Sequence, residues 1–133
     1  MKRILFILLL LLPFLGHTQI NTFPWIHDFE NGIQGMEQDT TDDGNWLLKQ
    51  GSTSSANTGP QGDHTTGNGN YFYVEASGTG VGYPNMVFTT YTPTFDVSST
   101  PGQIVSFWYH MYGSTMGDLE VGIVDNNGYT FLD

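Results

Sequence analysis

Cysteine is absent from all 133 residues of the sequence. This absence excludes a disulfide framework, a cysteine nucleophile and every zinc site built on thiolates. The Asn-x-Ser/Thr sequon is absent as well, so N-linked glycans cannot support the fold. We therefore expect the folded chain to be stabilised by its apolar core or by a bound ion.

Basic residues are nearly as scarce as cysteine. Three Lys and Arg residues face 13 Asp and Glu residues, for a formal net charge of −10. Lys2 and Arg3 stand at the N-terminus, which leaves Lys49 as the only basic residue (histidine aside) of the remaining chain. Such a surface repels nucleic acid and anionic lipid, and we exclude both as partners. It attracts hard cations, above all Ca²⁺, wherever carboxylates converge.

The N-terminal stretch "MKRILFILLLLLPFLGHTQ" is typical of a secretory signal peptide. Two basic residues precede an unbroken apolar run, Ile4–Leu12, which is too short for a membrane span. We expect residues 1–19 to be removed near Gln19, leaving one domain over residues 20–133 that does not insert into the membrane. The alternative is an uncleaved N-terminal anchor, because a clear small-x-small cleavage site is missing. Either way, we expect a secreted or cell-surface protein.

Helix signals are missing after this segment, since no run carries apolar residues at helical spacing over three turns. Short β-rich runs separated by Gly, Asn, Asp, Thr and Pro take their place. The pattern predicts an all-β fold, an antiparallel β-sandwich of jelly-roll type. The expected strands are Trp25–Phe29, Trp46–Lys49, Tyr71–Ala76, Met86–Thr90, Ile104–Tyr112, Leu119–Asp125 and Tyr129–Leu132.

The run Ile104–Tyr112 is apolar or aromatic on both faces, as expected of a central strand. Asn127-Gly128 lies between two strand-like runs and predicts a type I′ hairpin turn. The last strand stops at Leu132 without a closing turn, so we expect the domain to be incomplete at its C-terminus. The side chains expected to be buried are Phe29, Trp46, Phe72, Val74, Phe107, Tyr109, Leu119 and Val121.

Three blocks carry a resemblance to a known family. They are "HDFENGIQGMEQDTTDDGNW", "SANTGPQGDHTTGNGNYFYVEAS" and "SFWYHMYGSTMGDLEVGIVD". In order and spacing they resemble the MAM domain, named for meprin, the A5 antigen (neuropilin) and the receptor tyrosine phosphatase mu. The resemblance spans roughly residues 25–133. It implies an extracellular jelly-roll sandwich used for adhesion and oligomerisation, usually as one module of a larger protein.

The chain departs from this family at its cysteines. Members commonly place one before the Asp-Phe-Glu block and one shortly after it; His27 and Gln34 occupy those positions here. A third family cysteine corresponds to Ile104. Losing a native disulfide costs a small secreted domain about 2–5 kcal/mol, so another interaction must offset the loss.

Catalytic machinery is not found in the sequence, and we predict a non-enzyme. Gly-x-Ser-x-Gly and His-Glu-x-x-His are both absent, and the histidines lack zinc-type spacing. Asp42 and Asp43 are expected to be solvated loop residues, and His110 to be a hydrogen-bonded structural histidine. His64, next to Asp63, is expected to be a turn and packing residue.

A structural cation is the chemistry that the acidic residues favour, and Ca²⁺ is the expected ion. The resemblance implies a cation near the Phe-Glu, Gln-Asp and Asp-His-Thr blocks, which correspond to Glu30, Asp39 and Asp63, with Glu75 as a weaker fourth ligand. The alternative leaves the ion out: Asp63 caps a turn, and Glu30 and Asp39 make buried polar contacts.

The sequence thus predicts a non-catalytic extracellular adhesion or recognition module. Its expected partner is an extracellular protein or a glycan, and homophilic association is possible. The alternative is a carbohydrate-binding module attached to a secreted polysaccharide-degrading enzyme. In that case the face of Tyr71 and Tyr73 is the expected sugar platform.

Overall fold

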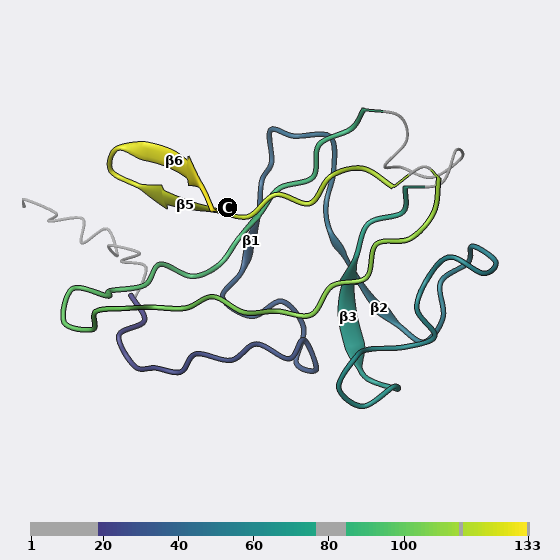
Figure 1. Cartoon of the computed structure of the whole chain (residues 1–133), viewed down its shortest axis with the longest axis horizontal. Helices are drawn as coiled ribbons and strands as arrows, with labels where there is room; N and C mark the ends of the chain where they lie inside the picture. The colour runs from purple at the N-terminus through teal and green to yellow at the C-terminus, as the bar shows by residue number, and fades with distance from the viewer. Residues whose placement is uncertain (1–18, 77–84, 115, 133) are drawn as a thin grey trace, which may run out of the picture.

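The computed structural model describes residues 19–76, 85–114 and 116–132, and these contain strands but no helix. The strands form three antiparallel two-stranded sheets, β1 with β4, β2 with β3 and β5 with β6 (Figure 1). The all-β antiparallel prediction is confirmed. The bounds are β1 Glu37–Gln38, β2 Leu47–Gln50, β3 Asn70–Tyr73, β4 Thr90–Tyr91, β5 Gly122–Asp125 and β6 Gly128–Phe131.

The pair β2–β3 is the central ladder of the molecule. Leu47 pairs with Tyr73 and Lys49 with Tyr71, so these four side chains share one face. Phe72 belongs to the opposite face. Each strand overlaps a predicted strand over three residues, Leu47–Lys49 and Tyr71–Tyr73, because alternating aromatic and aliphatic residues suit a pleated sheet.

A row of half-buried rings runs along the N-terminal segment towards this ladder. Each neighbouring pair has ring centroids 4.6–6.0 Å apart, in tilted, edge-on or stacked geometry. The row takes the place of a closed core, since no hydrophobic side chain among the described residues is fully buried. Its members, in spatial order, are Phe23, Phe95, Trp25, His27, Phe29, Phe72 and Trp46.

Local geometry explains why Trp25–Phe29 is not a strand, contrary to prediction. The amide of Phe29 donates to Nδ1 of His27 at 3.2 Å, and Phe29 has a φ of +63°. A left-handed residue cannot continue a β-ladder. The predicted strand at Met86–Thr90 is also wrong except for Thr90, and the short strand β1 was not predicted.

The prediction of a central strand at Ile104–Tyr112 is wrong. The stretch is extended and crosses the length of the molecule (Figure 1), yet none of its main-chain groups bonds to another described residue. Without a neighbouring strand on either side, Phe107 and Tyr109 stay exposed. Leu119 is exposed too, which corrects the predicted core. The other predicted core residues, Phe29, Trp46, Phe72, Val74 and Val121, are half-buried.

The hairpin β5–β6 forms where two strands were predicted, but its turn differs. Asn126 and Asn127 are the loop residues, and neither has a positive φ, whereas Gly128 has a φ of +112°. A type I′ turn needs positive φ at both central residues, so that prediction is wrong. The carboxylate of Asp125 accepts the Asn127 amide at 2.7 Å and stabilises the turn that forms instead.

Within the described ranges, no helix is long and apolar enough to cross a bilayer. The predicted signal peptide, residues 1–19, lies outside the described residues except for Gln19.

Candidate functional site

Two of the predicted ligands, Glu30 and Asp63, meet at the start of β3. The amide of Gly69 donates to Asp63 Oδ1 at 2.6 Å, and the next amide, of Asn70, donates to Glu30 Oε1 at 2.8 Å. A Cβ at Gly69 would overlap the Glu30 carboxylate and lie 3.1 Å from Asp63 Cγ. Glycine is therefore needed here so that both carboxylates can approach the main chain.

The carboxylate of Asp63 is fully used by its own turn. Oδ2 accepts the amides of Thr65 and Thr66 at 2.9 and 2.8 Å, and Oδ1 accepts the Thr66 hydroxyl at 2.7 Å besides Gly69. Four donors fill the roughly four acceptor positions of a carboxylate. The Thr66 amide and hydroxyl, followed by the other amides, hold the pKa of Asp63 far below its usual range.

Asp39, the third predicted ligand, is engaged elsewhere, beside the β1–β4 pair. Its carboxylate accepts the hydroxyl and amide of Thr41 at 2.6 and 2.7 Å, and the Tyr91 hydroxyl at 2.8 Å. The Thr41 hydrogen bonds, with that of Tyr91, lower the pKa of Asp39 to about 2. The carboxylate is therefore ionised at neutral pH and fastens a loop to β4.

Glu75, the weaker fourth ligand, ties the loop at residues 51–60 to the end of β3. It accepts hydrogen bonds from the hydroxyls of Ser54, Ser55 and Tyr73. Burial, reinforced by the bond to Glu75, raises the pKa of Tyr73 to about 12. Tyr73 is therefore a neutral donor at physiological pH.

The structure thus brings Glu30 and Asp63 together and engages Asp39 and Glu75 in separate contacts. Within residues 19–76, 85–114 and 116–132, no three His, Asp or Glu side chains gather in an arrangement that could hold a metal ion. Glu30 and Asp63, with the carbonyls of Phe29 and Glu30 that face the Asn70 amide group, are the nearest approach to an oxygen-rich site.

His64 stacks flat on the indole of Trp108, with centroids 3.8 Å apart and planes 10° from parallel. It is thus a packing residue that contacts the extended stretch. His110 does not match its prediction as a structural histidine, because it is exposed and has no hydrogen bond to a described residue.

Asp42 and Asp43 are not solvated loop residues alone, contrary to expectation: Asp42 is half-buried, and both it and the exposed Asp43 accept hydrogen bonds from distant main-chain amides. Asp42 accepts the amides of Gly44 and Thr89, and Asp43 accepts the amide of Val87 at 2.7 Å. The pair therefore stabilises the loop after β1 against the segment before β4. Sequence reasoning missed this role because the partners lie more than forty positions away.

Tyr71 and Tyr73 do not form the flat surface that a sugar platform requires. Their rings are edge to face, with planes 85° apart, and the hydroxyls bond to the Gly51 carbonyl and to Glu75. A stacked sugar needs an open, level ring face.

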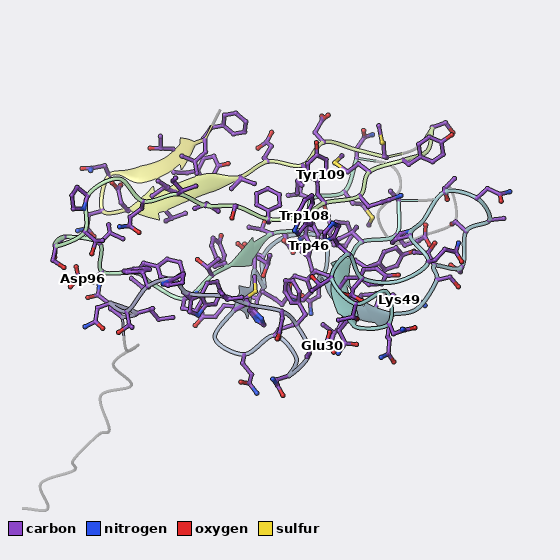
Figure 2. The ribbon with its side chains drawn as sticks, turned by 60° about the horizontal axis from the view of Figure 1, so that its bottom comes forward. Glu30, Trp46, Lys49, Asp96, Trp108 and Tyr109 are labelled. Carbon is purple, nitrogen blue, oxygen red and sulfur yellow. The ribbon has the colours of Figure 1, made fainter. Side chains whose placement is uncertain are left out.

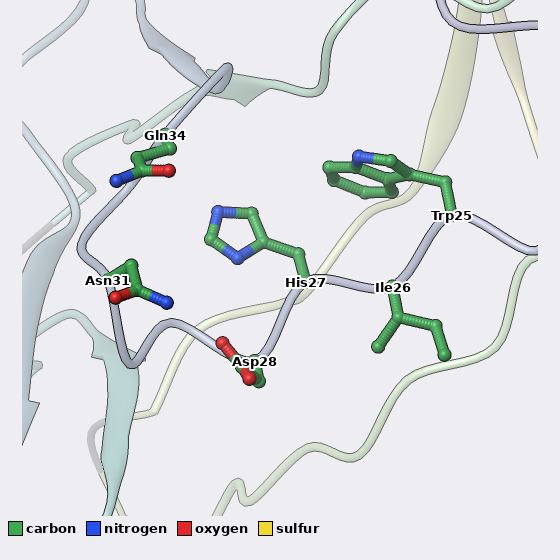
Figure 3. Close-up of a pocket in the computed structure, with 6 residues that line it drawn as sticks. All are labelled: Trp25, Ile26, His27, Asp28, Asn31 and Gln34. Carbon is green, nitrogen blue, oxygen red and sulfur yellow. The ribbon is translucent and has the colours of Figure 1, made fainter.

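A small pocket lies at the bend before β1 (Figure 3), and the sequence did not point to it. It is lined by Trp25, Ile26, His27, Asp28, Asn31 and Gln34, with a volume of about 190 Å³. The Nε2 atom of His27 is buried and lacks a hydrogen-bond partner among the described residues. The only available sequence signal was the appearance of His27 and Gln34 at two positions where the related family has cysteines.

Carboxylates that hold loops in place and aromatic side chains that stay exposed characterise this β-rich module. Comparison with known protein families shows to which family this module belongs. The family described as "MAM domain, meprin/A5/mu" matches residues 27–131, and the chain belongs to it. MAM domains are β-sandwich modules of extracellular, adhesion-type proteins, and they are generally non-catalytic.

Individual relatives agree with this assignment. Thyroid hormone-induced protein B of Xenopus laevis is 40% identical over 96 residues, and human MAM domain-containing protein 2 is 37% identical over 93. Each alignment covers 70% of this chain and 13% of the relative. Neuropilin-1a of Danio rerio is 38% identical over 77 residues, 57% of this chain and 8% of its own length. The chain thus spans about an eighth of the first two relatives. No solved structure matches it significantly.

Proposed function

We propose that the chain is a non-catalytic adhesion module, secreted or at the cell surface, that binds an extracellular protein. The observation that carries this proposal is the exposed stretch Ile104–Tyr112. It contains Phe107, Trp108 and Tyr109, which are 54%, 75% and 70% exposed. Figure 2 labels Trp108 and Tyr109. Adjacent exposed aromatic side chains are the residue types enriched at the centres of protein interfaces.

The area of this surface is of the right order for a protein contact. With aromatic side chains of about 150–250 Å² each, the exposed parts of Phe107, Trp108, Tyr109 and Tyr112 amount to roughly 400–670 Å², divided between the two faces of the extended stretch. A specific interface buries about 800 Å² per partner, and Ile104 and Val105 beside them are also exposed. An open hollow of about 300 Å³ at Ser106, Phe107 and Trp108 can receive a side chain from the partner.

Backbone chemistry supports a protein partner over a sugar at this surface. The stretch is extended, and its amides and carbonyls are not bonded to other described residues. Another polypeptide can satisfy these groups by adding a strand while its side chains cover the rings. The alternative function, a carbohydrate-binding module of a polysaccharide-degrading enzyme, relied on Tyr71 and Tyr73, whose geometry does not favour it.

The experiment compares protein binding by the wild-type chain and by Phe107→Ser and Trp108→Ser variants, against an array of extracellular domains. We expect at least one protein ligand, with affinity reduced about tenfold or more by each substitution, because central aromatic contacts contribute about 2 kcal/mol or more. Ile123→Ser on the hairpin is the matched control, since Ile123 is similarly exposed (52%). Sedimentation velocity on the same samples tests homophilic association.

Two results would contradict the proposal. One is glycan binding without any protein ligand, which favours the carbohydrate-binding alternative. The other is protection of the Trp108 fluorescence from iodide quenching in the parent protein without a partner. This result would show that another part of the parent protein covers the stretch Ile104–Tyr112.

We further propose that a structural cation, Ca²⁺ by the chemistry of the donors, binds beside Glu30 and Asp63. The ionised state of Asp63, the convergence of the two carboxylates at Gly69 and the acidic composition support it. Because four donors already occupy Asp63, an ion would have to displace one of them or rely mainly on Glu30 and loop carbonyls. Asp39 and Glu75 would contribute only if their present hydrogen bonds were broken.

A further inference from the structure

The pocket at the bend before β1 contains a buried hydrogen-bond donor without a partner among the described residues, and several polar side chains line it. Nδ1 of His27 accepts the amide of Phe29 at 3.2 Å, so Nε2 carries the hydrogen in the neutral ring. That Nε2–H is buried without a partner among the described residues. Buried donors are nearly always satisfied in folded proteins. Water does not reach this atom from the pocket, so a ligand group satisfies it only if the side chains over it move aside.

The side chains around His27 offer both donors and acceptors. Figure 3 shows its imidazole facing the carboxamides of Asn31 and Gln34, while Ile26 points away. Each carboxamide has two donor hydrogens and one acceptor oxygen. Asp28 adds a carboxylate, one oxygen of which accepts the Glu30 amide at 3.1 Å. The indole of Trp25 borders the same space as an apolar wall.

Charge and size narrow the class of ligand. Asp28 and the formal charge of −10 disfavour an anion, and a single carboxylate beside an N–H donor is a poor site for a cation. The volume of about 190 Å³ equals roughly six water volumes, smaller than the pockets of drug-sized ligands. A neutral, ring-sized molecule with several hydroxyl groups fits, because each hydroxyl both donates and accepts.

We propose that Trp25, His27, Asn31 and Gln34 form a binding site for a single neutral saccharide residue, separate from the aromatic stretch Ile104–Tyr112. The two carboxamides bind neighbouring hydroxyls, a further hydroxyl accepts from His27 Nε2 once the side chains over that atom move aside, and C–H groups of the sugar lie beside the indole of Trp25. This site goes beyond the proposed protein-binding function and does not depend on it.

The test is an NMR titration of the ¹⁵N-labelled chain with methyl glycosides of glucose, galactose, mannose and N-acetylglucosamine, each up to about 50 mM, a range suited to millimolar affinity. We expect shifts at the His27 ring and at the Asn31 and Gln34 side-chain amides for at least one sugar. Gln34→Leu and Asn31→Ala change exposed residues, and each should weaken binding about fivefold per hydrogen bond lost. Gln61→Leu, an exposed glutamine outside the pocket, is the matched control and should bind as wild type.

Three outcomes would overturn the proposal: no shift with any of the four sugars, shifts that Gln34→Leu leaves unchanged, or shifts centred on Tyr71 and Tyr73. The first would mean that the pocket holds water only. Because Gln34→Leu leaves Phe107 and Trp108 untouched, it should also leave any protein binding unchanged, so the two proposals fail independently.

Discussion

At the scale of single residues, several acidic side chains of this chain hold loops in place by accepting hydrogen bonds. Asp63, Asp39 and Asp96 each accept hydrogen bonds from donors two or three positions ahead, and each has a lowered pKa for that reason. These are Asx-type turns, which Asp forms with its own neighbours. Their local character explains why the sequence pattern "GDHTT" was enough to expect a turn at Asp63.

We predict that Asp63→Asn reduces the amount by which the free energy of unfolding falls at low pH. The folded-state pKa of Asp63 is far below its unfolded value of about 3.9. Its stabilisation is therefore present above that unfolded value and is lost as the pH falls through the folded pKa. Urea unfolding of wild type and variant at pH 7, 4 and 3 measures the effect, and the wild type should lose more stability than the variant below pH 4.

Asp118→Asn is the control for this prediction, since Asp118 is exposed and has no hydrogen bond to another described residue. The Asp118→Asn variant should lose as much free energy of unfolding between pH 7 and pH 3 as the wild type does. Equal acid dependence of Asp63→Asn and wild type would contradict the assigned role of Asp63.

A second residue-scale prediction concerns Asp42, whose carboxylate joins the amides of Gly44 and Thr89. Asp42→Ala should lower the free energy of unfolding by about 1.5–3 kcal/mol, the usual range for a hydrogen bond to a charged group. Chemical denaturation at pH 7 measures it. A change as small as that of a solvated position, within about 0.5 kcal/mol, would restore the original expectation that Asp42 is solvated.

At the scale of elements, the three strand pairs differ in how much supports them. The pair β2–β3 is flanked by the aromatic row, by the turn at Asp63 and by the loop that Glu75 ties to the end of β3. Among the described residues the hairpin β5–β6 pairs with no other strand, and all its residues except Gly122 are exposed. A lone two-stranded hairpin is at best marginally stable in water.

We therefore predict that hydrogen exchange is fastest in β5–β6 and slowest in β2–β3. Among ladder amides, those of Ile123 and Thr130 should exchange at least about tenfold faster than those of Lys49 and Tyr71, because opening the hairpin costs little free energy. Exchange followed by NMR measures the difference. Equal protection in both pairs would show that β5–β6 packs against another surface in solution.

At the scale of the whole molecule, the formal charge is −10, cysteine is absent, and no hydrophobic side chain within the described part of the chain is fully buried, so the fold has few sources of stability. An ion that binds only the folded state would contribute RT ln(1 + [L]/Kd), about 2.7 kcal/mol at a hundredfold excess over Kd. This magnitude is comparable to one disulfide.

We predict that the thermal midpoint rises in millimolar Ca²⁺ and falls on addition of chelator, and that Glu30→Gln and Asp63→Asn each reduce the difference. Differential scanning calorimetry measures it, with Asp118→Asn as control. A midpoint that is the same with Ca²⁺ and with chelator would eliminate the structural ion and leave the alternative, in which Asp63 is a turn residue alone.

The sequence by itself determined the properties that depend on composition and neighbours: the all-β class, the β2–β3 and β5–β6 runs, the Asp63 turn and the family. Only the tertiary structure decided the rest. It brought Asp42 to Thr89, separated Asp39 and Glu75 from the Glu30–Asp63 pair, shifted the hairpin turn to Asn126 and Asn127, and enclosed the pocket at His27. It also left Ile104–Tyr112 without a paired strand among the described residues, although its pattern is that of a central strand. The physical reason is that alternation of side chains specifies extended backbone and its two faces, whereas pairing and burial depend on which distant segments lie beside them.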